Sequence, residues 1–326
     1  MKIVTLFSGV GMTEIGIQRA LPDDDIELVK FCEFDKRVAA AFCRLHDEPE
    51  TKNLGDITAV NISEIELGDI DVLTSTFPCQ SFSTAGTQLG FEHEQKGNLF
   101  EKTAQMIDKL KPKVVVLENV KGILAKKFDA MNIISARLAQ IGYRLQWQVI
   151  NAVNHGLPQA RLRWIAVCLP VNKPLFKYPD ARLNNTKVVA DFIDATVASR
   201  KVSNDMVNQM QRLVASNPTV TRDPTKIIKL YDGYTTGEFR SGFTRHRIMS
   251  TQGVSPTLTT TNDTSFMEIG GLLTPKERWR LMGLSDAQFE KMRPLSDRAI
   301  DKIAGNGVCT NVIEDVFKSL RKQNFI

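Results

Sequence analysis

Strand-like and helix-like segments alternate through the first 170 residues, and this alternation limits the fold more than any other feature of the sequence. Short β-branched, apolar runs predict strands at residues 2–7, 26–34, 70–77, 113–118, 143–151 and 163–169. Apolar residues at helical spacing predict helices at residues 13–21, 36–45, 99–110 and 131–141. Strands that alternate with helices favour a layered α/β fold with a largely parallel sheet.

The chain changes character after Pro170. Proline and glycine recur through residues 171–252, where the one extended helical pattern covers residues 189–214. Helical periodicity returns at residue 273, and the apolar stripe over residues 312–320 needs a surface to pack on. We therefore expect an α/β domain at 1–170, a smaller loop-rich domain at 171–252, and a C-terminal segment at 253–326 that returns to the first domain.

Cysteine and histidine counts exclude two kinds of site. The chain has five cysteines without a CxxC pair and only four histidines, so the sequence predicts neither a disulfide framework nor a metal site. No run approaches the roughly 18 consecutive apolar residues of a membrane span. Met1 leads directly into a predicted strand instead of a signal peptide. We expect a cytoplasmic protein with no membrane partner.

Positive charge is concentrated in the middle of the chain. Residues 171–252 contain 13 Lys and Arg against 7 Asp and Glu, although the whole chain has a net charge of only +5. A solvated basic face is the ordinary explanation at this size. A basic domain beside a nearly neutral one is also what a polyanionic substrate would favour.

The first predicted strand ends in Phe7-Ser8-Gly9-Val10-Gly11, directly before the first predicted helix. Glycines at such a turn let the backbone approach a bound cofactor. Glu14 takes the third glycine position of the dinucleotide fingerprint GxGxxG, so a nicotinamide cofactor is disfavoured. Glu33, at the end of the second predicted strand, is placed to bind ribose hydroxyls. An adenosyl cofactor without pyrophosphate fits both, although a simple turn and a surface glutamate would explain each singly.

A thiol and a carboxylate follow two other predicted strands. Cys79 lies in Pro78-Cys79-Gln80, after the strand at 70–77, and Glu118 ends the strand at 113–118. A thiolate can add to an electron-poor carbon while a carboxylic acid stabilises the charge that develops. Each residue alone has a common structural explanation, as a small buried side chain and as a helix cap or salt-bridge partner.

Six motifs in order along the chain decide between these explanations. They are Phe7-Ser8-Gly9-Val10-Gly11, Gly55-Asp56-Ile57, Pro78-Cys79-Gln80-Ser81-Phe82-Ser83, Glu118-Asn119-Val120, Gln159-Ala160-Arg161-Leu162-Arg163 and Gly305-Asn306-Gly307-Val308. With them the sequence resembles the C5-cytosine DNA methyltransferases over residues 1–170 and 247–320. The resemblance implies a Rossmann-like sheet that binds S-adenosylmethionine and a smaller target-recognition domain. It also implies duplex DNA as substrate, in restriction–modification or in phage or host DNA modification; a monomer suffices.

The resemblance implies a mechanism as well. Cys79 would add to C6 of cytosine, which makes C5 nucleophilic toward the methyl donor, and Glu118 would hydrogen-bond or protonate N3. Arg163, and with it Arg161, would hold the carboxylate, the base oxygen O2 or nearby phosphates. A duplex hides C5 and C6, so the base must be flipped out, and we expect residues 81–98 to form a mobile loop that closes over it.

Contact residues follow from the same resemblance. The cofactor pocket would contain Phe7, Gly9, Gly11, Met12, Glu33, Phe34, Asp56, Ile57, Pro78, Leu99, Asn306 and Val308. Glu33 would bind the ribose and Phe34 would stack on adenine, whereas Met12 is a departure because many members have glycine there. The motifs and the basic middle region give as DNA contacts Gln80, Ser83, Gln159, Arg240, Arg245, Arg247 and Thr257.

Two alternatives share part of these features. A transfer RNA methyltransferase of the same superfamily has nearly all the catalytic motifs but usually carries a Cys-Phe-Thr tripeptide, to which Gly242-Phe243-Thr244 is the nearest approach here. A non-catalytic DNA-binding relative would explain the basic region but gives no reason for Cys79, Glu118 and Arg163 together.

Overall fold

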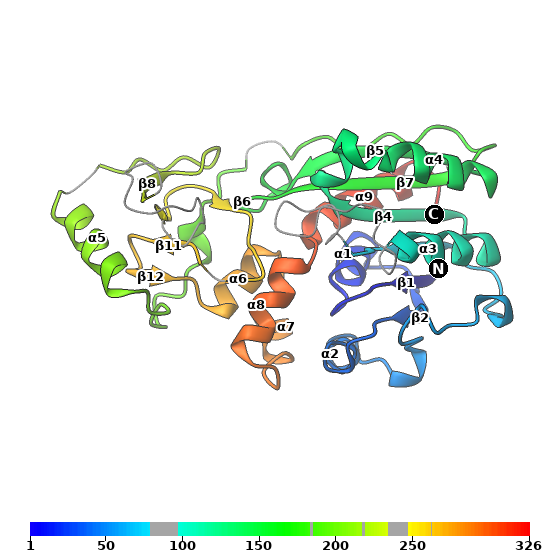
Figure 1. The fold of residues 1–326 in the computed structure, drawn as a ribbon, viewed down its shortest axis with the longest axis horizontal. Coiled ribbons are helices and arrows are strands. Elements are labelled where there is room, and N and C mark those ends of the chain that lie inside the picture. Colours follow the sequence, from blue (N-terminus) through cyan, green and yellow to red (C-terminus); the bar gives the residue numbers. More distant parts are fainter. Residues whose placement is uncertain (79–96, 183–184, 217–218, 234–246, 262) are drawn as a thin grey trace. The chain divides into compact units, whose positions relative to one another are not determined.

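A computed structural model describes the 326-residue chain except for residues 79–96, 183–184, 217–218, 234–246 and 262 (Figure 1). The described residues form two compact units. Unit 1 contains residues 1–150, 162–180 and 312–326, and unit 2 contains residues 151–161 and 181–311.

Unit 1 is built on a sheet with the strand order β2-β1-β3-β4-β7-β5 (Figure 1). Its strands are β1 (Lys2–Leu6), β2 (Glu27–Cys32), β3 (Val72–Ser75), β4 (Val114–Val120), β5 (Tyr143–Asn151) and β7 (Leu162–Pro170). β1 is parallel to β2 and β3, and β3 is parallel to β4, whereas β7 is antiparallel to β4. The carboxyl ends of β1, β2, β3 and β4 therefore meet at one edge, where such folds place their ligands.

The helices of unit 1 are α1 (Met12–Ala20), α2 (Lys36–His46), α3 (Gly97–Leu110), α4 (Ala130–Gln140) and, from residue 312 onward, α9 (Thr310–Lys322). An ion pair of 2.7 Å between Arg19 and Glu314 joins α1 to α9. β3 is buried at every position and β4 at all but its last, which is typical of parallel strands covered on both faces. Each large apolar side chain buried in this core stabilises the fold by about 1.5–3 kcal/mol.

Unit 2 contains two small sheets and short helices. β6 (Gln159–Ala160) pairs in parallel with β10 (Ser255–Pro256). The second sheet has the order β12-β11-β9-β8 and contains β8 (Lys229–Asp232), β9 (Arg247–Met249), β11 (Ser265–Phe266) and β12 (Gly271–Leu272). The helices are α5 (Asn204–Ala215), α6 (Pro275–Leu281), α7 (Asp286–Glu290) and α8 (Asp297–Asn306).

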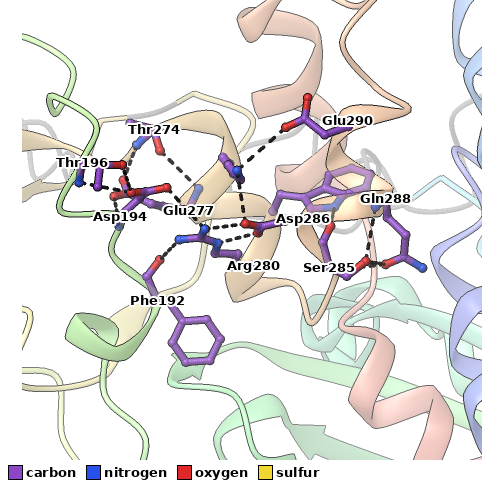
Figure 2. A network of polar contacts seen from close by, with 12 residues as sticks. Phe192, Asp194, Thr196, Thr274, Glu277, Arg280, Ser285, Asp286, Gln288 and Glu290 are labelled. Carbon is purple, nitrogen blue, oxygen red and sulfur yellow. Dashed lines mark hydrogen bonds and ion pairs between the residues drawn. The ribbon is translucent and has the colours of Figure 1, made fainter.

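Arg280 joins three parts of unit 2. Figure 2 shows its guanidinium between the carbonyl group of Phe192 and the carboxylate of Asp286, to which it donates from Nε and Nη2, both at 2.7 Å. This fork lowers the pKa of Asp286 to about 2. Glu277 Oε1 accepts a hydrogen bond of 2.9 Å from the main-chain N–H of Asp194. Polar contacts therefore fix residues 192–194 against α6 and α7.

The predicted α/β fold is confirmed, but two expectations in the middle of the chain differ from the structure. The single helix predicted over residues 189–214 is wrong: a 3-10 turn covers Val189–Phe192, and α5 begins only after Ser203. Arg200 is instead extended and bridges to Leu272, and the Ser203 hydroxyl accepts from Met206 N to start the helix.

The compact units also cut the chain at positions other than 170 and 252. Residues 171–180 belong to unit 1, where the Tyr178 hydroxyl donates to the carbonyl groups of Gln146 and Ile165. Residues 253–311 belong to unit 2, because β10 pairs with β6 and β12 pairs with β11. Among the described residues, no helix is long and apolar enough to cross a membrane, and no three potential ligands gather as a metal site.

Candidate functional site

A carboxylate and a guanidinium face each other across β4 and β7. Arg163 Nε lies 3.0 Å from Glu118 Oε1, and each side chain is only 11% exposed. The register of two antiparallel strands sets this pair, so a rigid part of the fold holds it. A charge-assisted contact with little access to water orients the carboxylate firmly.

The pair lies at the edge where the parallel strands end. Asn119 Nδ2 donates to the carbonyl oxygen of Phe77 at 3.1 Å, and Thr76 Oγ1 donates to the carbonyl oxygen of Phe7 at 2.7 Å. These two bonds join the carboxyl ends of β1, β3 and β4. The chain that leaves β3 through Pro78 therefore starts at the edge that holds the acid.

Several predicted residues lie outside the described part of the chain. They are Cys79, Gln80, Ser83, Arg240 and Arg245, together with residues 81–96 of the expected loop. The last two residues of that loop, 97 and 98, instead form the start of α3. The role of Cys79 remains a prediction, with Pro78 as the nearest described position.

The turn after β1 has an unusual backbone. Phe7, Gly9 and Gly11 all have positive φ angles, of 56°, 58° and 84°. A Cβ atom at Gly11 would lie 2.0 Å from Nε2 of His46, so this position accepts only glycine, whereas a Cβ at Gly9 would meet no atom within 4 Å. A left-handed φ at Phe7 costs energy and is typical of a functional turn. The turn is thus packed on one side at Gly11 and open at Gly9.

Glu33 follows β2 and reaches back to this turn. Its Oε2 accepts a hydrogen bond of 3.0 Å from Gly9 N, and its Oε1 accepts one of 2.8 Å from Asp35 N. Burial raises the pKa of Glu33, while these main-chain donors oppose the rise. The next residue, Phe34, is 74% exposed, which is rare for an aromatic side chain and leaves its ring available for stacking.

Asn53 was missed by the sequence reasoning. Its side-chain oxygen accepts from Glu33 N and its amide nitrogen donates to Glu33 O, both at 3.0 Å. Asn53 therefore fixes the main chain that carries Glu33, and its position just before Gly55-Asp56-Ile57 was the available sequence indication. Of that motif, Asp56 is exposed and Ile57 is buried.

Met12 and Glu14 both point into the fold. Met12 is 3% exposed and Glu14 is 2% exposed, so neither side chain occupies the surface of the turn. The replacement of glycine by Met12 therefore does not narrow the turn with an exposed side chain. Desolvation raises the pKa of Glu14 to about 7.

Gln159 and Arg161 have contacts that differ from the predicted ones. Arg161 is 1% exposed and donates to the carbonyl oxygens of Leu258 at 2.9 Å, Gly305 at 2.7 Å and Gly307 at 2.5 Å. Gln159 is fully buried and donates to the carbonyl oxygen of Leu281 at 2.9 Å. Both side chains are committed to main-chain groups inside unit 2, so the roles predicted for them at Glu118 and at DNA stay predictions.

The other predicted residues of unit 2 range from buried to exposed. Arg247 is half-buried and donates from Nε to Asp232 at 3.1 Å, and Thr257 is half-buried and donates to the carbonyl oxygen of Ala160 at 2.5 Å. Asn306 is exposed and Val308 is buried. Leu99, in α3 of unit 1, is half-buried.

A charged hollow lies elsewhere in unit 1. It has a volume of about 440 Å³ and is lined by Asp24, Asp71, Lys113 and Arg321 among others. Asp71 and Lys113 directly precede β3 and β4, so the hollow is at the amino ends of the strands. It is therefore separate from the candidate site.

Comparison with known proteins gives the family that the six sequence motifs indicated, and the match covers most of the chain. The family model described as C-5 cytosine-specific DNA methylase matches residues 1–322. The type II methyltransferase M.HhaI of Haemophilus parahaemolyticus is 30% identical over 326 residues, which cover 96% of this chain and 92% of that protein. M.NlaX of Neisseria lactamica is 28% identical, with 98% and 96% covered, and the orphan methyltransferase M.SPBetaI of Bacillus phage SPbeta is 25% identical, with 98% and 97% covered.

A solved structure shares the fold. The Dnmt2 methyltransferase of S. pombe has a TM-score of 0.70 at 15% identity and covers 99% of both chains. The Rossmann-like methyltransferase fold and the resemblance read from the six motifs are both confirmed. Because the family model spans nearly every residue, the chain belongs to the family of C-5 cytosine-specific DNA methylases.

Proposed function

We propose that the protein flips a cytosine out of duplex DNA and transfers a methyl group from S-adenosylmethionine to C5, through a covalent bond between Cys79 and C6. Family membership supports the reaction class, and the type II and phage relatives support restriction–modification or phage DNA modification as the setting. The observation that carries the proposal is the buried Glu118–Arg163 pair at the strand edge from which the chain leads to Cys79.

The turn after β1 fits the adenosyl cofactor. Each carboxylate oxygen of Glu33 accepts one main-chain N–H and has capacity for a second donor, such as a ribose hydroxyl. Phe34 would stack on adenine, and the open space at Gly9 would admit the cofactor close to the backbone. The other expected pocket residues of unit 1 that complete this proposal are Phe7, Gly11, Asp56, Ile57, Pro78 and Leu99. When bound, S-adenosylmethionine supplies a methyl group on a positively charged sulfur.

Three side chains would carry the chemistry on the base. The Cys79 thiolate forms a bond to C6, and the electrons of the C5–C6 double bond make C5 a nucleophile. Glu118 donates a hydrogen bond or a proton to N3 and so stabilises the negative charge that the addition creates. Arg163 holds the carboxyl group and is available to O2 of the base. After C5 is methylated, loss of its proton and cleavage of the S–C6 bond restore the aromatic ring and Cys79.

Unit 2 would recognise the DNA around the target. Its main segment contains most of the basic region at residues 171–252, and positive charge of this kind binds phosphates without reading sequence. Arg247 and Thr257 are the described candidates for DNA contact. One copy of the chain contains every residue that this mechanism uses, so we propose a monomer.

Bisulfite sequencing of plasmid DNA tests the function and the nucleophile together. Expression in a host without cytosine methylation is expected to protect cytosines in one short sequence context. Cys79→Ala is expected to abolish this protection because the proposed adduct forms on the Cys79 thiolate. Soluble, folded wild-type protein that protects no cytosine would contradict the proposal. Methyl incorporation with transfer RNA as competitor would then show whether RNA is the substrate.

A further inference from the structure

Two buried arginines hold the main chain of one segment in unit 2. Arg161 Nη1 donates to the carbonyl oxygen of Leu258 at 2.9 Å, and Arg278 Nη2 donates to the carbonyl oxygen of Thr259 at 2.5 Å. Arg161 is 1% exposed and Arg278 is 2% exposed. We call Arg161 and Arg278 the arginine clamp. Because these guanidinium groups are buried inside unit 2, they donate hydrogen bonds to main-chain carbonyl groups and have almost no contact with solvent.

Asp301 in α8 anchors one side of the clamp. Its Oδ1 lies 2.9 Å from Arg278 Nε, and Asp301 is 5% exposed at its side chain. Arg200 contacts the other carboxylate oxygen of Asp301, but among the described residues it makes no hydrogen bond to residues 257–261. A buried arginine is costly unless its charge is paired, so the ion pair stabilises Arg278 in the place from which it reaches Thr259.

Gly305 holds the same segment from another direction. A Cβ atom at Gly305 would lie 2.3 Å from the carbonyl oxygen of Thr259 and 2.4 Å from the main-chain nitrogen of Thr260. Such distances are too short for any larger residue, so only glycine lets α8 approach this closely. Steric contact and hydrogen bonds therefore fix the backbone of the segment together.

Three exposed threonines begin where the clamp holds the chain. Thr259, Thr260 and Thr261 are all exposed, although Leu258 before them is 4% exposed. We call residues 259–261 the threonine segment. The Thr259 hydroxyl donates to the carbonyl oxygen of Thr261, and the Thr261 hydroxyl donates to Asp263. Main-chain N–H groups and the Thr260 hydroxyl are the kinds of donor that bind DNA phosphates. A segment that is fixed before binding avoids the entropic cost of being ordered on the DNA.

We propose that Arg161 and Arg278 are positioning residues that preorganise the threonine segment as a contact for DNA phosphates. The inference rests on DNA being the substrate, and it adds a role for Arg278, which no sequence motif indicated. Neither arginine touches the nucleic acid in this arrangement. Their effect on DNA passes through the main chain of Leu258 and Thr259.

Comparison of Arg278→Met with Arg200→Met tests the proposal. Each variant removes one arginine that pairs with Asp301, but only Arg278→Met also removes a hydrogen bond to the carbonyl oxygen of Thr259. Binding of a short fluorescent duplex is measured by anisotropy at several salt concentrations, without cofactor. We expect Arg278→Met to bind about tenfold more weakly than Arg200→Met with the same salt dependence, because no phosphate-neutralising charge differs between them. Amide hydrogen exchange is expected to accelerate at residues 258–261 and nowhere else.

Equal affinities of the two variants would overturn the proposal. A salt slope that is smaller by about one in Arg278→Met than in Arg200→Met would overturn it too, because Arg278 would then neutralise a phosphate itself. Faster exchange throughout unit 2 in Arg278→Met would also overturn the proposal, because Arg278 would then stabilise the whole unit and not residues 258–261 in particular. If Arg278→Met fails to fold, Gly305→Ala decides, since it displaces Thr259 and leaves the clamp's charges intact: unchanged duplex affinity refutes the proposal. Wild-type protein that binds duplex without methylating it would instead refute only the proposed function.

Discussion

Glu14 is an acidic side chain in a place that favours its neutral form. It lies in α1, which follows the turn after β1, and neither carboxylate oxygen makes a hydrogen bond to a described residue. Burial therefore raises its pKa from 4.5 to about 7. The folded state holds this proton more tightly than the unfolded state, so folding stability falls as pH rises from 4.5 to 7 and stays constant above that range.

Glu14→Gln is expected to remove this pH dependence. The shift corresponds to about 3 kcal/mol at pH 8 and less than about 1 kcal/mol at pH 5, so the variant should be more stable than the wild type by about those amounts. Urea unfolding at the two pH values measures the difference. Glu27→Gln, at the exposed start of β2, is the control and should change stability by under about 0.5 kcal/mol. A constant difference between the two pH values would refute the assignment.

Sequence reasoning placed Arg163 beside Glu118, but it did not show that the nearby Arg161 has different contacts. Arg161 and Arg163 are two residues apart, and spacing alone does not distinguish a guanidinium bound to carbonyl oxygens from one that faces a carboxylate. The carbonyl groups to which the Arg161 side chain donates lie 97 to 146 positions away along the chain, so only the folded structure reveals them. Asn53 was missed for the same reason, because its bonds to Glu33 are made by tertiary contact.

At the level of elements, Asp35 links the start of α2 to Glu33. The Asp35 side chain accepts from the main-chain N–H groups of Arg37 at 3.0 Å and Val38 at 3.4 Å, so it caps the helix. The main-chain N–H of Asp35 donates to Glu33. Asp35 thus caps the helix with its side chain and orients Glu33, the residue proposed to bind the ribose, with its main-chain N–H.

Asp35→Ala should separate these two functions. Loss of the cap is expected to destabilise the protein by about 1 kcal/mol, because two helix N–H groups lose their acceptor. Affinity for S-adenosylhomocysteine, measured by calorimetry, should change by less than about twofold because the main-chain donor to Glu33 remains. Asp35→Asn retains a capping oxygen and should recover most of the stability. A large loss of affinity in Asp35→Asn would show that the Asp35 carboxylate itself binds the cofactor.

Strong periodicity predicted the elements of the first 170 residues, but it failed over residues 189–214. The strands and helices that were predicted in the first 170 residues lie within a few residues of their predicted ends, because long apolar runs and helical spacing leave little choice there. The two-residue strand β6 was not predicted. Residues 189–214 have helical spacing too, yet Arg200 bridges to Leu272 and the chain is extended at that point. A contact more than 70 residues away along the chain overrides local preference, and no local pattern records it.

At the scale of the whole molecule, the net positive charge is concentrated in one stretch of sequence. Between about 50 and 200 mM salt, a protein with six to ten phosphate contacts loses roughly 10³- to 10⁵-fold in DNA affinity. We expect a loss of at least about 100-fold for this protein, measured by fluorescence anisotropy with duplex DNA, because residues 171–252 contain 13 Lys and Arg. Affinity for S-adenosylhomocysteine should change little over the same range. Salt-independent DNA binding would argue against phosphate contacts from unit 2.

The pairing of β6 with β10 also sets rules for protein engineering. A chimaera that exchanges only residues 171–252 with a relative would keep Gln159 and Arg161. It would alter the surroundings of Leu258, whose main chain both side chains bind. The natural modules for grafting are residues 151–161 and 181–311 taken together, which carry both strands and the arginine clamp. Cut at those junctions, the segment proposed to recognise DNA becomes a transplantable part that keeps its internal contacts.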